Sequence, residues 1–194
     1  MDEAVRAVRD ALEPTGRDDP GSVILVAHSG AGLLVPWIVD VLDPRPAATV
    51  FVDAGLPDRD VASVEIAGPT LRDPLRSLVN VDGMLPPWFG WWGRGALDAL
   101  VPDPRRRSAL EAEMPPIPIA YLEGSVPVPA GWPRVPGAYL AFGDEAYAAE
   151  IRRARTWRWP VAVFEGAGHL HMVVEPRSVA RGIVSLAEAA LVGR

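Results

Sequence analysis

The hydrophobic residues of this chain form short runs that alternate with stretches of helical periodicity. Residues 23–27 and 48–52 are rich in β-branched and other apolar side chains, which is typical of strands covered on both faces. Residues 33–42, which lie between them, have helical spacing and end before an Asp-Pro pair. We therefore predict a βαβ unit with a parallel sheet and the right-handed crossover that almost all such units share.

The same rhythm returns in the last third of the chain. The pattern predicts strands at residues 138–142 and 161–164, and helices at residues 147–155 and 176–191. A further helix is predicted at the N-terminus over residues 1–13, with acidic residues in its first turn. The fold class is therefore α/β.

A segment rich in proline, tryptophan and glycine interrupts this rhythm over residues 54–136. We interpret it as an inserted lid or cap, and residues 1–53 and 137–194 as the core domain that it interrupts. Within the insertion, the pattern predicts short helices at residues 60–66 and 95–100.

Composition excludes several classes of function. The formal charge of −6 and the isoelectric point near 5.1 leave no basic face for a nucleic-acid backbone. No apolar run reaches the roughly 18 residues of a membrane span, and the N-terminus begins with acids rather than the basic residues of a signal peptide. We therefore expect a cytoplasmic protein without nucleic-acid or membrane partners. With no cysteine and three histidines, we also expect no metal and no cofactor.

The first candidate site lies where the first predicted strand turns into the following helix. There the sequence reads Ala27-His28-Ser29-Gly30-Ala31, with small residues two before and two after the serine. This resembles the nucleophile elbow of the α/β-hydrolase superfamily, in the branch of small esterases and hydroxynitrile lyases. Bulky neighbours at those two positions are expected to clash with the adjoining backbone. The resemblance implies that Ser29 is the nucleophile and that the Gly30 N–H stabilises an oxyanion.

The order of motifs agrees with that resemblance. Gly166-Ala167-Gly168-His169 follows the last predicted strand and precedes the last helix, where the superfamily holds its catalytic histidine. The insertion also falls where the superfamily places a lid. We therefore assign His169 as the base, whereas His171 and His28 are interpreted as polar residues in or near the pocket wall.

The catalytic carboxylate is less well defined. The family commonly has an Asp three residues after a Gly that follows the strand after the lid, but in Gly143-Asp144-Glu145-Ala146 that position is an alanine. Asp144 is the nearest substitute, Glu145 is the next, and Asp53 at the end of the preceding strand is an alternative. The competing interpretation of Asp144 and Glu145 is a solvated helix start.

The resemblance also implies a shortened fold. The superfamily's first four strands, with the loop that supplies a second oxyanion donor, would lie before Met1. The fold class is thus a three-layer α/β-hydrolase-like parallel sheet with a Pro/Trp-rich lid insertion and a shortened N-terminus. The strand that carries Ser29 becomes a sheet edge, and we expect either a homodimer through this edge or a shortened form of a longer hydrolase.

The insertion carries a cluster of aromatic residues, including Trp88, Trp91 and Trp92, with Trp132 further along. These rings either line an apolar substrate pocket or form the insertion's own small core. We keep both interpretations.

The sequence therefore supports a serine hydrolase acting on a small or medium apolar ester, lactone or thioester. A different enzymatic activity, C–C cleavage of the kind that hydroxynitrile-lyase-like members perform, is kept as an alternative. Two non-enzymatic interpretations also stay open. One is a non-catalytic protein of the same fold that binds a hydrophobic molecule or a partner, and the second is an inactive fragment.

Overall fold

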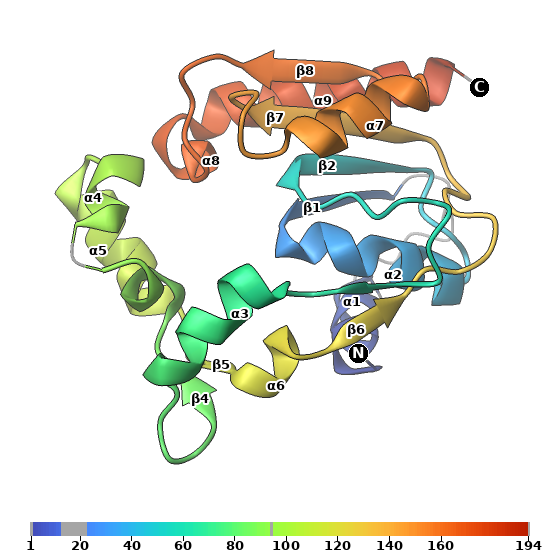
Figure 1. Ribbon diagram of the computed structural model, residues 1–194. Helices are drawn as coiled ribbons and strands as arrows, with labels where there is room; N and C mark the ends of the chain where they lie inside the picture. The colour runs from blue at the N-terminus through green and yellow to red at the C-terminus, as the bar shows by residue number, and fades with distance from the viewer. Residues whose placement is uncertain (1, 13–22, 94, 194) are drawn as a thin grey trace. The chain divides into compact units, whose positions relative to one another are not determined.

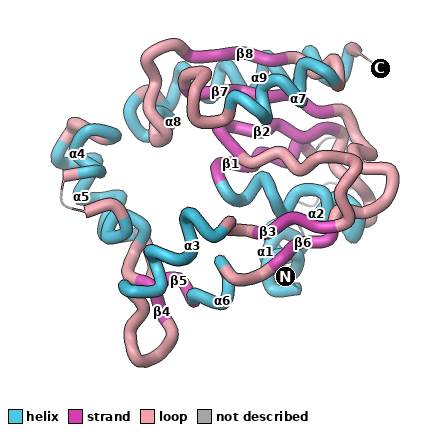
Figure 2. Tube along the Cα trace, in the orientation of Figure 1, coloured by secondary structure: helices cyan, strands magenta, loops and turns pink. Residues whose placement is uncertain are grey.

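The computed structural model describes residues 2–12, 23–93 and 95–193. Its main element is a parallel sheet of four strands in the order β1-β2-β7-β8 (Figures 1 and 2). The strands are β1 (Ile24–Ser29), β2 (Ala48–Ala54), β7 (Gly137–Phe142) and β8 (Val161–Phe164). All four predicted strands are confirmed, each within two residues of its predicted ends.

Two helices cover opposite faces of this sheet. In α7 (Ala148–Thr156), the buried Ile151 belongs to the same core cluster as Tyr139 of β7. In α9 (Pro176–Val192), Gly182 lies against Phe164 and the neighbouring strand residue Leu140. Because Tyr139 and Leu140 are adjacent in a strand, their side chains point to opposite faces, and Figure 1 shows α7 and α9 on either side of β7 and β8. The three-layer arrangement predicted from the sequence is confirmed.

The core of the sheet is aromatic. Phe51 in β2 has its ring centroid 5.7 Å from that of Trp159, 6.3 Å from that of Trp132 and 6.5 Å from that of Tyr139. Trp132 lies within the predicted insertion in the sequence, but its side chain is part of the sheet core. β2 is buried along its whole length, as expected for a strand covered on both faces.

The first helical segments agree with the prediction in position. The N-terminal helix is α1 (Asp2–Leu12), and the helix predicted over 33–42 consists of a 3₁₀ helix η3 (Gly30–Leu34) followed by α2 (Val35–Val41). Pro36 lies in the first turn of α2, where a missing N–H costs nothing because that group has no intrahelical partner.

The described residues divide into two compact units. The first comprises residues up to 64, 126–167 and 181 onward, and the second comprises 65–125 and 168–180. The second unit is narrower than the predicted 54–136 insertion and includes the chain after β8. Its elements are α3 (Pro69–Leu75), η4 (Arg76–Leu78), β4 (Met84–Leu85), η5 (Trp88–Trp91), α4 (Ala96–Leu100), α5 (Pro104–Glu113), β5 (Ile117–Pro118), α6 (Ile119–Leu122) and α8 (His171–Val174).

One predicted helix is wrong. Residues 60–66 contain no helix, because strand β3 (Ser63–Glu65) pairs instead with β6 (Ser125–Pro127) at the point where the chain passes between the units. The local apolar spacing fitted a short helix, but pairing with a segment about sixty residues away overrides such weak local preferences. The other short helix, predicted at 95–100, is confirmed as α4.

Among the described strands, β1 is at one end of the sheet order and pairs with β2. Val26 in the middle of β1 is 44% exposed. An edge strand of this kind presents unpaired backbone groups to other chains. The homodimer expected through this edge stays a prediction.

Candidate active site

Ser29 occupies a strained turn at the end of β1. Its backbone has φ 57° and ψ −133°, a combination that side-chain-bearing residues rarely adopt. The register with β2 shifts between His28 and Ser29, and the Ser29 carbonyl accepts the Gly55 N–H at 3.1 Å. The chain then enters η3 directly. This is the sharp strand-to-helix turn that a nucleophile elbow requires.

The crowding around this turn falls on a different residue from the one expected. Ala27, two residues before the serine, is buried as predicted, but Ala31, two residues after it, is exposed. The tight position is Gly32, where a Cβ would lie 2.1 Å from the Gly55 carbonyl oxygen. Gly32 of η3 therefore faces the end of β2.

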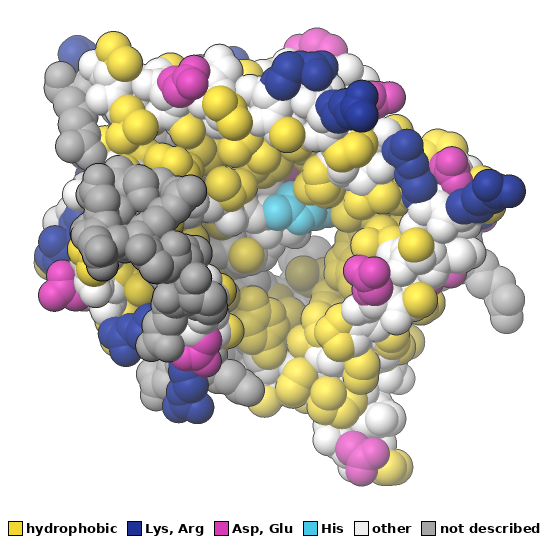
Figure 3. All heavy atoms as spheres, turned by 180° about the vertical axis from the view of Figure 1, so that it is seen from behind, with side chains coloured by type: hydrophobic (Ala, Val, Ile, Leu, Met, Phe, Trp, Pro, Cys, Tyr) yellow, Lys and Arg dark blue, Asp and Glu magenta, His cyan; other side chains and the backbone are white. Residues whose placement is uncertain are grey.

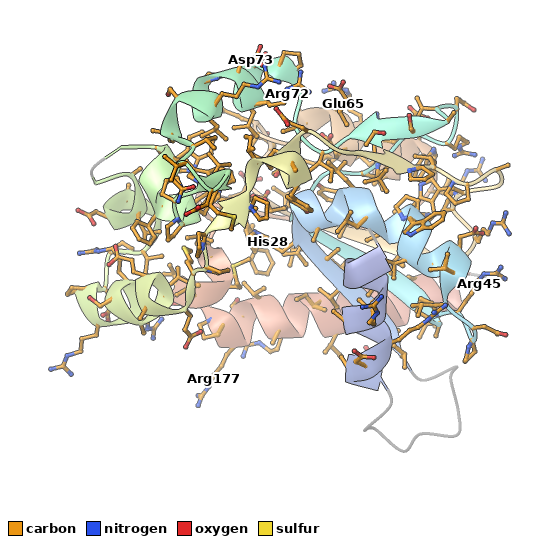
Figure 4. All side chains as sticks on the ribbon, turned by 90° about the horizontal axis from the view of Figure 1, so that it is seen from below. His28, Arg45, Glu65, Arg72, Asp73 and Arg177 are labelled. Atoms are coloured by element: carbon orange, nitrogen blue, oxygen red, sulfur yellow. The ribbon has the colours of Figure 1, made fainter. Side chains whose placement is uncertain are left out.

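Gly30 opens η3 directly after the serine. A Cβ built on Gly30 would meet no atom within 4 Å, so space is open beside this backbone. His28, labelled in Figure 4, lies near the carboxyl end of β1 and is half-buried. Ligands of open α/β sheets bind outside the carboxyl ends of the strands, which is the end where these residues lie.

The structure brings one residue to Ser29 that sequence reasoning missed. The Tyr147 side chain, directly before α7, forms a hydrogen bond with Ser29. Burial raises the pKa of the Tyr147 phenol above its ordinary value, the hydrogen bond with Ser29 opposes this, and the carboxylates of Asp53 and Glu150 raise the pKa further. The carboxyl ends of β1 and β7 lie at the same edge of the sheet with β2 between them, and no motif in the sequence marks Tyr147 as a partner of Ser29.

The three candidate carboxylates differ in their surroundings. Asp144 and Glu145 lie in the loop after β7 and are exposed. Asp53, at the end of β2, is 2% exposed, and its Oδ1 accepts the Phe142 N–H at 3.0 Å. Asp53 therefore links the carboxyl ends of β2 and β7, whereas the Asp144 side chain faces solvent.

The second unit contains His169. The residue is half-buried, and its ring centroid lies 6.2 Å from that of Trp88 at an interplanar angle of 38°. The following residue, Leu170, is buried in a cluster with Leu97 and Val101. Packing of the imidazole and of its neighbour thus fixes the loop that carries His169.

Further contacts hold the short helix α8, which follows this loop and begins at His171. The His171 N–H donates to the Gly168 carbonyl at 2.8 Å. From α5, one guanidinium nitrogen of Arg106 donates to the carbonyls of Val173 and Val174 at 2.9 and 2.5 Å. Arg106 therefore satisfies backbone carbonyls at the C-terminal end of α8.

The three tryptophans of the cluster have different environments within the second unit. Trp91 packs against the cluster of Leu75 and Leu85, and its Nε1 donates to the Pro86 carbonyl at 2.8 Å. Trp88 contacts His169 as described, and it also meets Trp92 with 6.0 Å between ring centroids. Trp92 is 48% exposed. Trp91 thus contributes to the unit's own core, whereas Trp88 and Trp92 present aromatic surface.

The described ranges contain neither a metal cluster nor a membrane span. Within residues 2–12, 23–93 and 95–193, no group of three or more acidic or histidine side chains could hold a metal ion. No helix in the described part of the chain is long and apolar enough to cross a membrane. On the face drawn in Figure 3, basic side chains are scattered among acidic and hydrophobic ones.

A parallel sheet with a strained serine turn at the carboxyl end of one strand defines the class of α/β-hydrolase-like proteins. The family model of the alpha/beta hydrolase family matches residues 1–181. The chain therefore belongs to the alpha/beta hydrolase family, and the resemblance proposed from the sequence is confirmed.

Solved structures agree with this assignment. An extracellular alpha/beta-hydrolase from a Paenibacillus species, described as sharing structural and functional homology with tobacco salicylic acid binding protein 2, matches with TM-score 0.66 and 19% identity over 94% of this chain and 77% of that one. Polyneuridine aldehyde esterase matches with TM-score 0.61 and 13% identity over 94% and 78%. A serine-to-alanine variant of the pyrethroid hydrolase PytH matches with TM-score 0.56 and 20% identity over 95% and 76%. At these identities the likeness is one of fold, which the TM-scores show. A search of curated proteins finds no match.

Proposed function

We propose that this chain is a serine hydrolase that acts on a small or medium apolar ester, lactone or thioester. The observation that carries the proposal is the strained backbone of Ser29, because a serine is held in such a conformation only where its surroundings enforce it. The names of two structural neighbours, an esterase and a pyrethroid hydrolase, support the same reaction class.

In the proposed mechanism, Ser29 Oγ attacks the substrate carbonyl while His169 takes the serine proton. The Gly30 N–H stabilises the oxyanion that forms. When the tetrahedral intermediate collapses, His169 returns the proton to the leaving alcohol or thiol, and an acyl-enzyme remains. Water activated by the same imidazole then attacks the acyl group and releases the acid, which restores the serine hydroxyl.

A carboxylate completes the arrangement by orienting the imidazole and stabilising its protonated form. Of the candidates, Asp53 has stronger support than Asp144, because it is buried and already accepts a backbone hydrogen bond. In less polar surroundings a charge acts more strongly on its neighbours than it does in water. Replacing Asp144 or Glu145 by the matching amide should therefore change kcat little, whereas Asp53→Asn should lower it by a factor of about 10² or more, as expected when an orienting carboxylate is lost.

Aromatic side chains provide the apolar surface for the substrate. We assign Trp88 and Trp92 to this role, together with His28 beside the nucleophile, and treat Trp91 mainly as support for the Trp88 segment. Substituting Trp88 by Leu should raise KM more for long acyl chains than for acetate, because it removes buried apolar contact area.

The decisive experiment is labelling of the folded protein by a fluorophosphonate probe, with Ser29→Ala as the control and mass spectrometry to locate the adduct. We expect labelling at Ser29 that is absent in the variant, together with turnover of p-nitrophenyl esters. If the folded chain is neither labelled at Ser29 nor active, the proposed hydrolase activity is refuted. It would favour the non-catalytic alternative, a protein that binds a hydrophobic molecule.

A further inference from the structure

Tyr147 is held beside the proposed nucleophile by both its backbone and its ring. Its carbonyl accepts the Ile151 N–H at 2.9 Å, which fixes the residue at the first turn of α7. Its ring packs against the core cluster of the first unit, which includes Phe51 and Tyr139. From this position the hydroxyl reaches Ser29. The hydrogen bond is therefore made by a side chain with little freedom to move away.

We propose that the Tyr147 hydroxyl is a catalytic hydrogen-bond donor to the oxyanion formed at Ser29, acting together with the Gly30 N–H. This inference rests on the proposed hydrolase function. The oxyanion and Ser29 Oγ are bonded to the same carbon in the tetrahedral intermediate. A hydroxyl that already forms a hydrogen bond with the Ser29 side chain in the free protein therefore needs only a small rotation to donate to the oxyanion.

The protonation state of Tyr147 agrees with the role of a donor. Burial raises the pKa of its phenol, and the carboxylates of Asp53 and Glu150 act in the same direction. The phenol therefore keeps its proton at neutral pH and has one O–H to donate. The same raised pKa makes Tyr147 an unsuitable general base, because a base must lose its proton before it can accept one from Ser29.

The place of Tyr147 in the fold also suits a donor to an oxyanion at Ser29. The carboxyl ends of β1 and β7 lie at the same edge of the sheet, and Tyr147 follows the loop after β7. Gly30 follows Ser29 directly on the chain and Tyr147 lies at the start of α7, so the two proposed donors come from different elements. Oxyanion holes commonly combine two donors in this way.

The test compares Tyr147→Phe, which removes only the hydroxyl, with wild type and with the control Tyr121→Phe in the second unit. On an ester that wild type hydrolyses, we expect kcat to fall by about 10²–10³-fold in Tyr147→Phe, the effect of losing one oxyanion donor. KM should change little, and Tyr121→Phe should behave as wild type. Near-UV circular dichroism checks that each variant is folded.

A second readout separates a donor from a residue that only supports the structure. Trifluoromethyl ketones add to a serine and form a tetrahedral adduct with an oxyanion, so their Ki should rise in Tyr147→Phe by about the factor by which kcat/KM falls. Fluorotyrosine placed at position 147 has a more acidic phenol of nearly the same size. Its proton is lost sooner, so the alkaline limb of the kcat profile should move to lower pH.

The outcomes distinguish this inference from the function on which it rests. If wild type is labelled at Ser29 and active, but folded Tyr147→Phe keeps kcat and Ki within about threefold, the role of Tyr147 is overturned and the hydrolase stands. If the alkaline limb does not move with fluorotyrosine, the role as a donor is likewise overturned. If wild type itself is neither labelled nor active, the proposed function fails, and this inference fails with it.

Discussion

The packing of Gly32 against the end of β2 gives a quantitative test of the serine turn. Replacing Gly32 by Ala adds one methyl group, whose carbon would lie 2.1 Å from the Gly55 carbonyl oxygen and 3.0 Å from the Ala54 Cβ. Real Cβ atoms essentially never come within 3.0 Å of another heavy atom, so the two segments must separate by close to an ångström. The nearest obstacle is backbone, which cannot rotate aside as a long side chain can.

Separation of these segments strains the turn directly. The Gly55 N–H donates to the Ser29 carbonyl, so a shift of Gly55 also disturbs the serine. Overpacking of a close-packed region costs about 1–3 kcal/mol. With a urea m-value of about 2–3 kcal/mol/M for a chain of this size, the unfolding midpoint should fall by about 0.3–1.5 M.

The assay is urea unfolding of Gly32→Ala followed by tryptophan fluorescence and circular dichroism, with Gly30→Ala as the matched control. A Cβ at Gly30 meets nothing within 4 Å, so that variant should unfold within about 0.5 kcal/mol of wild type. Equal midpoints for Gly32→Ala and wild type would refute the close approach of η3 and β2, and the structural argument for the turn with it.

Three further predictions concern strain, a buried hydroxyl and alkaline pH. Ser29→Gly should be about 1 kcal/mol more stable than Ser29→Ala in chemical unfolding, because only glycine relieves the positive φ, and an equal or more stable alanine variant would contradict the strain. Tyr139→Phe should lower the free energy of unfolding by about 1–3 kcal/mol in the same assay. The Tyr139 hydroxyl donates to the Ala54 carbonyl at 2.6 Å and accepts the Ala54 N–H at 3.1 Å, and the variant loses both hydrogen bonds. An unchanged midpoint would argue against that contact. Burial raises the pKa of all three tyrosines, Tyr121, Tyr139 and Tyr147. Above about pH 10 the unfolded chain therefore loses protons that the folded chain keeps, so stability should fall as pH rises, and phenolate absorbance should appear together with unfolding rather than at the ordinary tyrosine pKa.

Much of the sheet could be predicted because its strands are continuous apolar runs. A run such as residues 23–27 has no polar face, so it fits a strand covered on both sides and little else at that length. The helices between the strands carry their own boundaries, as Pro176 does at the start of α9. The motif around Ser29 indicates the class of fold. It can be read from the sequence because its residues are consecutive, between a buried strand and a helix.

The features that the sequence did not reveal depend on contacts between distant segments. Strand β3 has three residues and gains its identity from pairing with β6. Tyr147 reaches Ser29 through the arrangement of the sheet, and no spacing along the chain expresses that proximity. The burial of Asp53 and the exposure of Asp144 likewise follow from which strand end is covered, although both are acids placed at or just after the end of a strand.

The conformation of Ser29 bears on the choice between a catalytic and a binding role. A non-glycine residue in such a conformation costs of order 1–3 kcal/mol, whereas glycine adopts positive φ without that cost. If the turn had only a structural role, glycine at position 29 would make it more stable. Glycine differs from serine in lacking the side chain, so the side chain is what the strained serine provides. That side chain forms the hydrogen bond with Tyr147 at the edge of the sheet where ligands of α/β proteins bind. The strain therefore holds a hydroxyl in place at a binding edge, which is what the proposed chemistry at Ser29 requires.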